Sequence, residues 1–179
     1  MLNTTFNLAH KAGACTESYK KMAVALDITK YRKDTPIPLS NVLEVCGLHD
    51  AIWAMRCTQE NSENFIIEFA CRCAEHTLCN YENLYPEDKR PRKAIEAARV
   101  CITDKSETAR SAAWSAAGSA RSAAWSAAGS AAWSAAGSAA RSAESAAGSA
   151  ESAARSAAWS AETEWQTKTF LEMLDNYKL

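Results

Sequence analysis

Arg110-Ser-Ala-Ala-Trp114-Ser-Ala-Ala-Gly118-Ser-Ala120 is the stretch that decides the fold, and it recurs letter for letter from Arg121. Alanine and serine continue to dominate as far as residue 160, with one variable position in each short unit. Alanine is the best helix former, and a serine hydroxyl can bond back to the carbonyl four residues earlier. The eleven-residue cycle corresponds to about 3.67 residues per turn, close to a straight helix. The repeat is therefore predicted to be helical, with the variable residues in one stripe.

The length of the repeat limits how it can be arranged. A single helix of about 50 residues would be roughly 75 Å long. A compact globule of this chain length has a radius of gyration of only about 16 Å. We expect the repeat to fold back as a hairpin, with its turn between Gly129 and Gly137, where the regular spacing is lost. The indoles and the larger apolar residues after position 163 would anchor these thin helices.

The chain has three parts that differ in composition. Residues 1–104 are ordinary globular sequence, residues 105–162 carry the repeat, and residues 163–179 return to an amphipathic pattern. We expect the three parts to form one compact unit. No segment alternates convincingly between apolar and polar residues, so strands are not predicted. The prediction is an all-α fold, a helical bundle whose long Ala/Ser-rich helices pack back as a hairpin against the N-terminal helical region.

Caps and breakers mark the helix boundaries of the first part. Thr16 and Pro91 mark the first turns of two predicted helices. Pro91 does so because proline suits the first turn of a helix. Ser40 and Ser62 are the predicted N-caps of two others. Gly47 is the predicted stop of the helix that Ser40 begins.

Composition argues against several classes of protein. The net charge of −1 produces no overall electrostatic field that would attract a nucleic acid polymer or a membrane surface. There is no apolar run long enough to span a membrane, and no signal peptide is recognisable, so we expect a cytoplasmic protein. The seven cysteines lie mostly in apolar runs, and we interpret them as small core hydrophobes of a reduced protein.

A short cluster of cysteine and histidine is the one candidate metal site. Cys71, Cys73, His76 and Cys79 fall within nine residues. Their spacing is not that of paired metal ligands, and Cys71 and Cys73 point to different sides of a helix. Core packing is the favoured interpretation, and neither a metal nor another cofactor is predicted.

Three copies of Arg-Ser-Ala-Ala-Trp form the first candidate binding site. Residues four positions apart lie one turn apart on the same helix face, so each copy places a guanidinium beside an indole. This pair suits a ligand with an anionic group and a flat ring, because arginine forks onto phosphate and tryptophan stacks on a base. In the alternative interpretation, the tryptophans fill a groove between helices and the arginines reach outward. The pairs are Arg110 with Trp114, Arg121 with Trp125, and Arg155 with Trp159.

A basic turn is the second candidate site. Arg90, Arg92 and Lys93 crowd the start of a predicted helix, where free backbone N–H groups already favour anions. The alternative is a solvated turn whose basic residues pair with acidic neighbours.

His49 and Asp50 form the one constellation that resembles part of a catalytic site. Asp50 is placed to orient His49 as a general base. No serine or cysteine nucleophile is tied to them by a motif, and the sequence has no Gly-rich phosphate loop or hydrolase signature. We therefore expect no catalytic residues.

Three stretches resemble the Ala-rich immunity proteins of bacteria and their phages. The resemblance extends over roughly residues 15–175. It implies a toxin-immunity or anti-defence protein of the bacterial host cell, which neutralises a toxin or immune effector by binding and without catalysis. The stretches are Gly47-Leu-His-Asp-Ala-Ile-Trp-Ala-Met-Arg56, Tyr85-Pro-Glu-Asp-Lys-Arg-Pro-Arg-Lys-Ala-Ile-Glu-Ala-Ala98 and, after the Ala-rich region, Glu164-Trp-Gln-Thr-Lys-Thr-Phe-Leu171.

Three functions from different classes follow. The first is a non-enzymatic binding protein that sequesters a toxin or immune effector protein. The second is a phage-type sponge that holds a small nucleotide immune signal in pockets lined by the Arg/Trp pairs. The third is a structural Ala-rich helical protein. Thin Ala/Ser helices often need a second layer, so we also expect a homo-oligomer.

Overall fold

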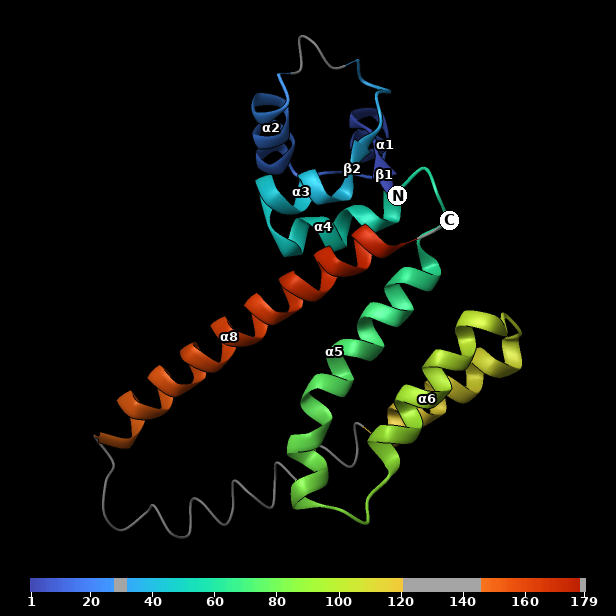
Figure 1. Cartoon of the computed structure of the whole chain (residues 1–179), viewed down its shortest axis with the longest axis vertical. Coiled ribbons are helices and arrows are strands. Elements are labelled where there is room, and N and C mark those ends of the chain that lie inside the picture. The colour runs from blue at the N-terminus through green and yellow to red at the C-terminus, as the bar shows by residue number, and fades with distance from the viewer. Residues whose placement is uncertain (28–31, 121–145, 178–179) are drawn as a thin grey trace. The chain divides into compact units, whose positions relative to one another are not determined.

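The structure, a computed structural model, describes residues 1–27, 32–120 and 146–177, and for residues 146–155 it describes the backbone only. Helices dominate these residues, and the single sheet among them has two strands of two residues each, which confirms the predicted all-α fold class (Figure 1). The chain divides into two compact units. The first unit is Met1–Phe69 with Thr163–Leu179, and the second is Ala70–Glu162.

The first unit is built from short helices and the small sheet. In the sheet, β1 (Asn3–Thr4) pairs antiparallel with β2 (Ile37–Pro38). This sheet was not predicted, because two residues per strand are too few for an alternating pattern to be visible. The helices of this unit that precede residue 63 are α1 (Phe6–Lys11), α2 (Thr16–Ala25), α3 (Leu39–Cys46), α4 (Leu48–Ala54) and the 3₁₀ turn η1 (Met55–Cys57).

Several helix boundaries lie where local chemistry predicted them. Thr16 is the first residue of α2, and Pro91 lies in the first turn of α6 (Arg90–Thr103). Gly47 ends α3 and leads directly into α4. Its φ of 88° and ψ of 177° belong to a backbone region that is essentially restricted to glycine, so this sharp connection requires Gly47.

The two predicted serine caps have different outcomes. Ser40 lies inside the first turn of α3, which begins after Pro38, so its prediction as an N-cap is wrong. Ser62 precedes α5 (Glu63–Leu84), as predicted. Its hydroxyl, however, donates to the carbonyl oxygen of Met55 at 2.7 Å. A serine hydroxyl can reach several backbone groups, and the surrounding fold decides which of them it bonds.

An aromatic cluster attaches the C-terminal residues to the core of the first unit. Phe170, in α8 (Ala146–Asn176), is buried. Its ring stands edge-on to Phe65 at 5.2 Å and to Phe69 at 5.0 Å between centroids. Phe65 also contacts Tyr177 at 5.4 Å. These separations are typical of favourable edge-to-face pairs, so the large apolar residues after position 163 do anchor this segment.

The second unit contains the rest of α5, then α6, a helix over residues 107–120, and the beginning of α8. Arg99 of α6 binds the two carboxylate oxygens of Glu75 on α5 at 2.6 and 3.0 Å. His76 of α5 lies 3.5 Å from Glu162 of α8. The two described ends of the Ala/Ser-rich repeat lie in the helix over residues 107–120 and in α8, so both are helical, as predicted.

The predicted turn between Gly129 and Gly137 lies outside the described residues. Among the helices that are described, none is both long and apolar enough to cross a membrane.

All seven cysteines are free thiols, but they do not all lie in the core. Cys57, Cys71 and Cys101 are buried, whereas Cys15 and Cys79 are exposed. The interpretation of the cysteines as small core hydrophobes is therefore correct for the first three and wrong for the other two. An apolar run at helical spacing does not by itself show which of its faces the fold will cover.

Candidate partner-binding surface

The helix over residues 107–120 carries the first Arg-Ser-Ala-Ala-Trp copy. Ser106 begins this helix, because its hydroxyl accepts a hydrogen bond from the Ala109 N–H at 3.1 Å. Arg110 and Trp114 follow one turn apart, and both are exposed. Trp114 in particular is 85% exposed. This copy thus presents a guanidinium and an indole at the surface of the second unit.

The last copy lies in α8. Arg155 and Trp159 are one helical turn apart in the backbone, and Trp159 is 78% exposed. The hydroxyl of Ser160 donates to the carbonyl oxygen of Ser156 at 3.0 Å. This is the backward bond over four residues that the serine pattern predicted. Ser160 is therefore accommodated in the helix with its hydroxyl bonded to the backbone.

Exposure separates the two interpretations of the repeat tryptophans. For Trp114 and Trp159, the interpretation as core residues that fill a groove between helices is wrong, because both are among the exposed large hydrophobic residues. The middle copy, Arg121 with Trp125, lies outside the described residues. Tryptophan is enriched where proteins bind partners, since one end of its ring system is apolar and the other can donate a hydrogen bond. The two described indoles therefore form a candidate contact surface.

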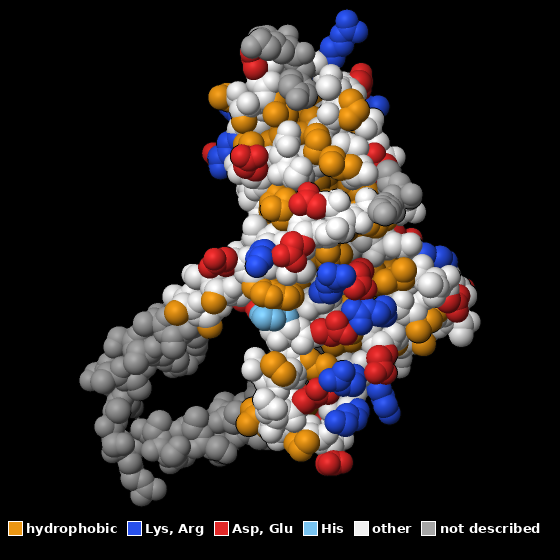
Figure 2. Space-filling view, in the orientation of Figure 1, with side chains coloured by type: hydrophobic (Ala, Val, Ile, Leu, Met, Phe, Trp, Pro, Cys, Tyr) orange, Lys and Arg blue, Asp and Glu red, His pale blue; other side chains and the backbone are white. Residues whose placement is uncertain are grey.

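The basic turn at the start of α6 is already paired within the chain. Arg90 binds the Asp88 carboxylate at 2.6 and 2.9 Å, and Arg92 binds Glu82 at 2.5 and 2.7 Å. The Arg90 guanidinium holds the pKa of the Asp88 carboxyl well below its usual range. Figure 2 shows basic and acidic side chains interspersed in the region of α5 and α6. Lys93 is exposed, but the two paired arginines present less net charge to an outside anion than the sequence indicates.

His49 and Asp50 are adjacent, but their geometry differs from that of an oriented general base. The His49 side chain is 95% exposed, and its Nδ1 lies 3.7 Å from Oδ1 of Asp50. Asp50 instead accepts a short hydrogen bond from the Ser18 hydroxyl on its Oδ2, at 2.6 Å. Sequence reasoning missed Ser18, because no motif connects it with a residue 32 positions later.

These observations define an all-α protein whose candidate surface consists of two indoles and the Arg110 guanidinium, displayed on the described ends of an Ala/Ser-rich helical repeat. Residues 56–170, more than half of the chain, match the model of a protein family described as Imm-5 like putative immunity protein. The chain belongs to this family of immunity proteins, which gives it an immunity-type role. Comparisons with curated proteins and with solved structures found no match.

The matched range and the predicted site coincide. Every predicted binding residue, from Arg90 to Trp159, lies within residues 56–170. The matched range begins at Arg56, so the part of the resemblance carried by residues 47–55 lies outside it. Helices α1 to α4 lie outside it as well.

Proposed function

We propose that this chain neutralises a toxin or immune effector protein by binding it, and that the tryptophans of the repeat are central contacts in the complex. The observation that carries the proposal is the exposure of Trp114 and Trp159 at the two described ends of the repeat. A few tryptophan, tyrosine and arginine residues commonly supply most of the energy of a protein interface. The family match supports the proposal, since an immunity-type role implies a binding partner.

The chemistry of the surface indicates the chemistry of the partner. Trp114 suits an apolar pocket, and Arg110, one turn away, suits a carboxylate at the rim of that pocket. Serine hydroxyls that alternate with these residues can complete the rim with hydrogen bonds. We therefore propose a partner protein whose apolar pocket is bordered by acidic residues. The other copies would repeat this contact, with Arg121, Trp125, Arg155 and Trp159 in the same roles.

The basic turn has a secondary role in this proposal. Arg90 and Arg92 each already share a carboxylate with their own chain, so an outside anion would have to compete for them. Lys93 is exposed beside them. We place Arg90, Arg92 and Lys93 at the margin of the interface, where charges mainly affect the rate of association rather than the affinity.

The proposed interaction is binding without a chemical step. Arginine remains protonated throughout the physiological range, and an indole N–H is only a donor. A surface built from these groups and serine can recognise a partner, but it provides no general base.

The remaining predictions concern the cellular setting. Seven free thiols, two of them exposed, suit the reducing cytoplasm of a bacterial cell. Assembly into a homo-oligomer also stays a prediction, since small alanine and serine side chains allow helices to approach closely. Light scattering on the purified full chain would measure the oligomeric state directly.

The proposal is tested with the partner itself. Affinity capture with the full chain from its native host should recover one protein, which is then purified and titrated against variants by calorimetry. The double variant Trp114→Ala/Trp159→Ala should bind at least about 30-fold more weakly, because removal of an interface hot spot costs about 2 kcal/mol or more. The matched control is Val24→Ala, which removes an exposed apolar side chain from the first unit and should bind like the wild type.

Two results would contradict the assignment of the surface. One is wild-type affinity in the double tryptophan variant with unchanged helical circular dichroism. The other is full capture of the partner by Arg121→Glu/Arg155→Glu, since reversing both charges should abolish binding to an acidic rim.

A nucleotide ligand is the alternative that the same surface must be tested against. Thermal melting with a panel of cyclic and linear nucleotides would detect it, because a ligand at 100 times its dissociation constant adds about 2.7 kcal/mol of stability. A shift that disappears in Trp114→Ala would replace the partner-protein proposal by nucleotide sequestration. An absent shift would favour the protein partner.

A further inference from the structure

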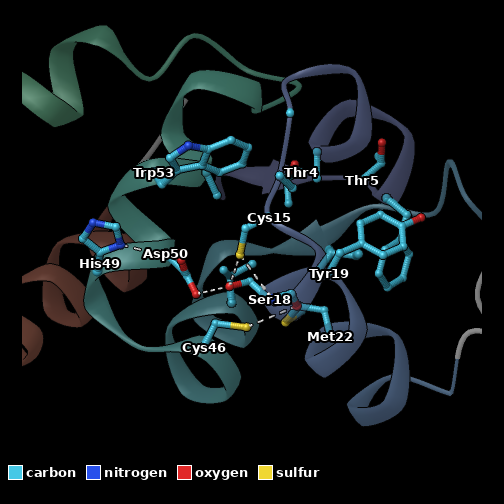
Figure 3. A pocket seen from close by; sticks show the side chains of 17 residues that line it. Thr4, Thr5, Cys15, Ser18, Tyr19, Met22, Cys46, His49, Asp50 and Trp53 are labelled. Carbon is cyan, nitrogen blue, oxygen red and sulfur yellow. Dashed lines mark hydrogen bonds and ion pairs between the residues drawn. The ribbon is translucent and has the colours of Figure 1, made fainter.

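The first unit contains a cavity of about 300 Å³, and the described residues that line it all lie between Thr4 and Ala54. Buried Phe6, Met22 and Ile37 contribute its apolar wall. The half-buried Trp53 also lines it (Figure 3). Sites for small molecules are typically concave, mostly apolar and roughly 300–1,000 Å³ in volume. The cavity falls at the lower end of this range, which suits a small ring system.

One side of the cavity is polar, and two hydrogen bonds between its side chains lead from Cys15 to Asp50. The Cys15 thiol donates to the Ser18 oxygen at 3.0 Å, and the Ser18 hydroxyl donates its single proton to Oδ2 of Asp50 at 2.6 Å (Figure 3). The series of donors therefore ends at a carboxylate, which still has an acceptor in Oδ1. Nδ1 of His49 lies 3.7 Å from Oδ1, which is beyond hydrogen-bond distance.

The charge of the lining is one-sided. Of the described residues around the cavity, only Asp50 carries a carboxylate, none is a lysine or an arginine, and His49 is the one side chain that can carry a positive charge, when it is protonated. The hydroxyls of Thr4 and Thr5 are engaged, with the Cys57 carbonyl oxygen and the Leu8 N–H respectively. An acceptor with negative charge at one edge of an apolar space complements a cationic donor, whereas an anion there would be repelled.

We propose that this cavity binds a small organic cation, a primary amine on an aromatic or branched apolar body. The ammonium group pairs with Asp50, and the apolar body lies against Phe6 and Met22. The indole of Trp53 is a second group that attracts cations, but the guanidinium of Arg56 already lies 5.0 Å from its ring centroid. Asp50 is therefore the group that positions the ammonium. The site lies outside the family match, in helices that precede residue 56.

A pair of probes with opposite charge tests the proposal on the wild-type chain. Tryptamine carries an ammonium and indole-3-propionate carries a carboxylate on the same ring system. Calorimetric titration of the full chain should show tryptamine binding at least about tenfold more tightly, because only its charge complements Asp50. This comparison uses the unmodified chain, so it does not depend on the folding of any variant.

Two variants with the same change in charge identify the residue responsible. Asp50→Asn should weaken tryptamine binding by at least about tenfold, while its amide oxygen can still accept the Ser18 hydrogen bond. Glu44→Gln is the matched control, because it removes one negative charge from an exposed position on the neighbouring α3. Its tryptamine affinity should equal that of the wild type.

Cys15 reports where the probe binds. Its thiol lines the cavity and is exposed, so iodoacetamide can reach it, and the Ser18 backbone N–H that donates to its sulfur at 3.4 Å helps to lower its pKa. Saturating tryptamine should slow iodoacetamide labelling of Cys15 severalfold and leave Cys79, an exposed thiol of the second unit, unchanged.

Three outcomes would each overturn the proposal. They are equal affinity for tryptamine and indole-3-propionate, unchanged tryptamine affinity in Asp50→Asn, and no binding of tryptamine, phenethylamine or tyramine at millimolar concentration. None of these results bears on the tryptophans of the repeat, so this proposal and the partner-binding proposal fail separately.

Discussion

Phe170→Ala and Trp114→Ala should differ sharply in their effect on stability, although each removes an aromatic ring from a helix. Phe170 is 1% exposed and stands edge-on to Phe65 and Phe69. Trp114 is 85% exposed. The first variant removes part of a core, and the second removes a ring that the chain itself hardly covers.

The structure sets the expected magnitudes. Truncation of a buried phenylalanine costs about 3–5 kcal/mol, because the transfer free energy is lost and a cavity remains between the neighbouring rings. A fully covered indole buries about 150–250 Å², so the covered remainder of Trp114 is about 20–40 Å². At about 25 cal/mol per Å², this remainder contributes about 0.5–1 kcal/mol. Alanine also has the higher helix propensity, which offsets part of that loss.

Urea unfolding followed by far-ultraviolet circular dichroism measures the difference. With a slope of about 1–3 kcal/mol per molar urea, Phe170→Ala should lower the midpoint by roughly 1–5 M, whereas Trp114→Ala should change it much less. Leu171→Ala is the matched control, since it truncates the next residue of α8, whose side chain is exposed. If Phe170→Ala populates no folded state, Phe170→Leu should show a smaller loss in the same direction.

Equal midpoints for the two alanine variants would refute this reasoning. A large loss in Trp114→Ala would mean that the indole is covered in solution, and the proposed contact surface would then be part of the protein's own core.

Gly47→Ala should lose about 1–3 kcal/mol of stability in the same urea assay because its φ of 88° disfavours any side chain, whereas Gly118→Ala, inside the repeat helix, should gain up to about 1 kcal/mol. Hydrogen bonds from Arg90 and Tyr81 depress the pKa of Asp88, so its ionised carboxylate stabilises the folded wild type, and this stabilisation is lost as pH falls below about 4. Asp88→Asn lacks the carboxylate, so its free energy of unfolding should fall less between neutral and acid pH. Urea midpoints measured across the acid range would show the difference. Iodoacetamide should label Cys15 and Cys79 before Cys57 and Cys71, because the first two thiols are exposed and the other two are buried. Mass spectrometry of the peptides gives the rates, and fast labelling of Cys57 in the native chain would contradict the burial assigned to it.

Local chemistry was enough to predict much of the fold. Alanine and serine predicted helix at both described ends of the repeat, and Gly47 and Pro91 marked real helix boundaries. Each of these rules depends on the backbone within a few residues, so no knowledge of the fold is needed. Ser40 shows the limit of such rules: it has the side chain of an N-cap, but α3 begins before it, next to the strand β2.

The residues of the candidate surface could be predicted from the sequence, but their exposure could not. The Arg-Ser-Ala-Ala-Trp copies were visible as a motif, and the helical period placed arginine and tryptophan one turn apart. A helix that is otherwise alanine and serine has no apolar stripe to show which side is covered, so the motif could not decide whether Trp114 and Trp159 lie inside or outside.

The sequence by itself therefore determined the all-α class, the helical repeat and the residues that make its surface distinctive. Tertiary structure alone decided the exposure of those tryptophans, the position of Phe170 between Phe65 and Phe69, and the contact of Ser18 with Asp50. The physical reason is distance along the chain. Helix formation is set by neighbours within about one turn, whereas burial and hydrogen bonding between distant residues depend on how the whole chain closes upon itself.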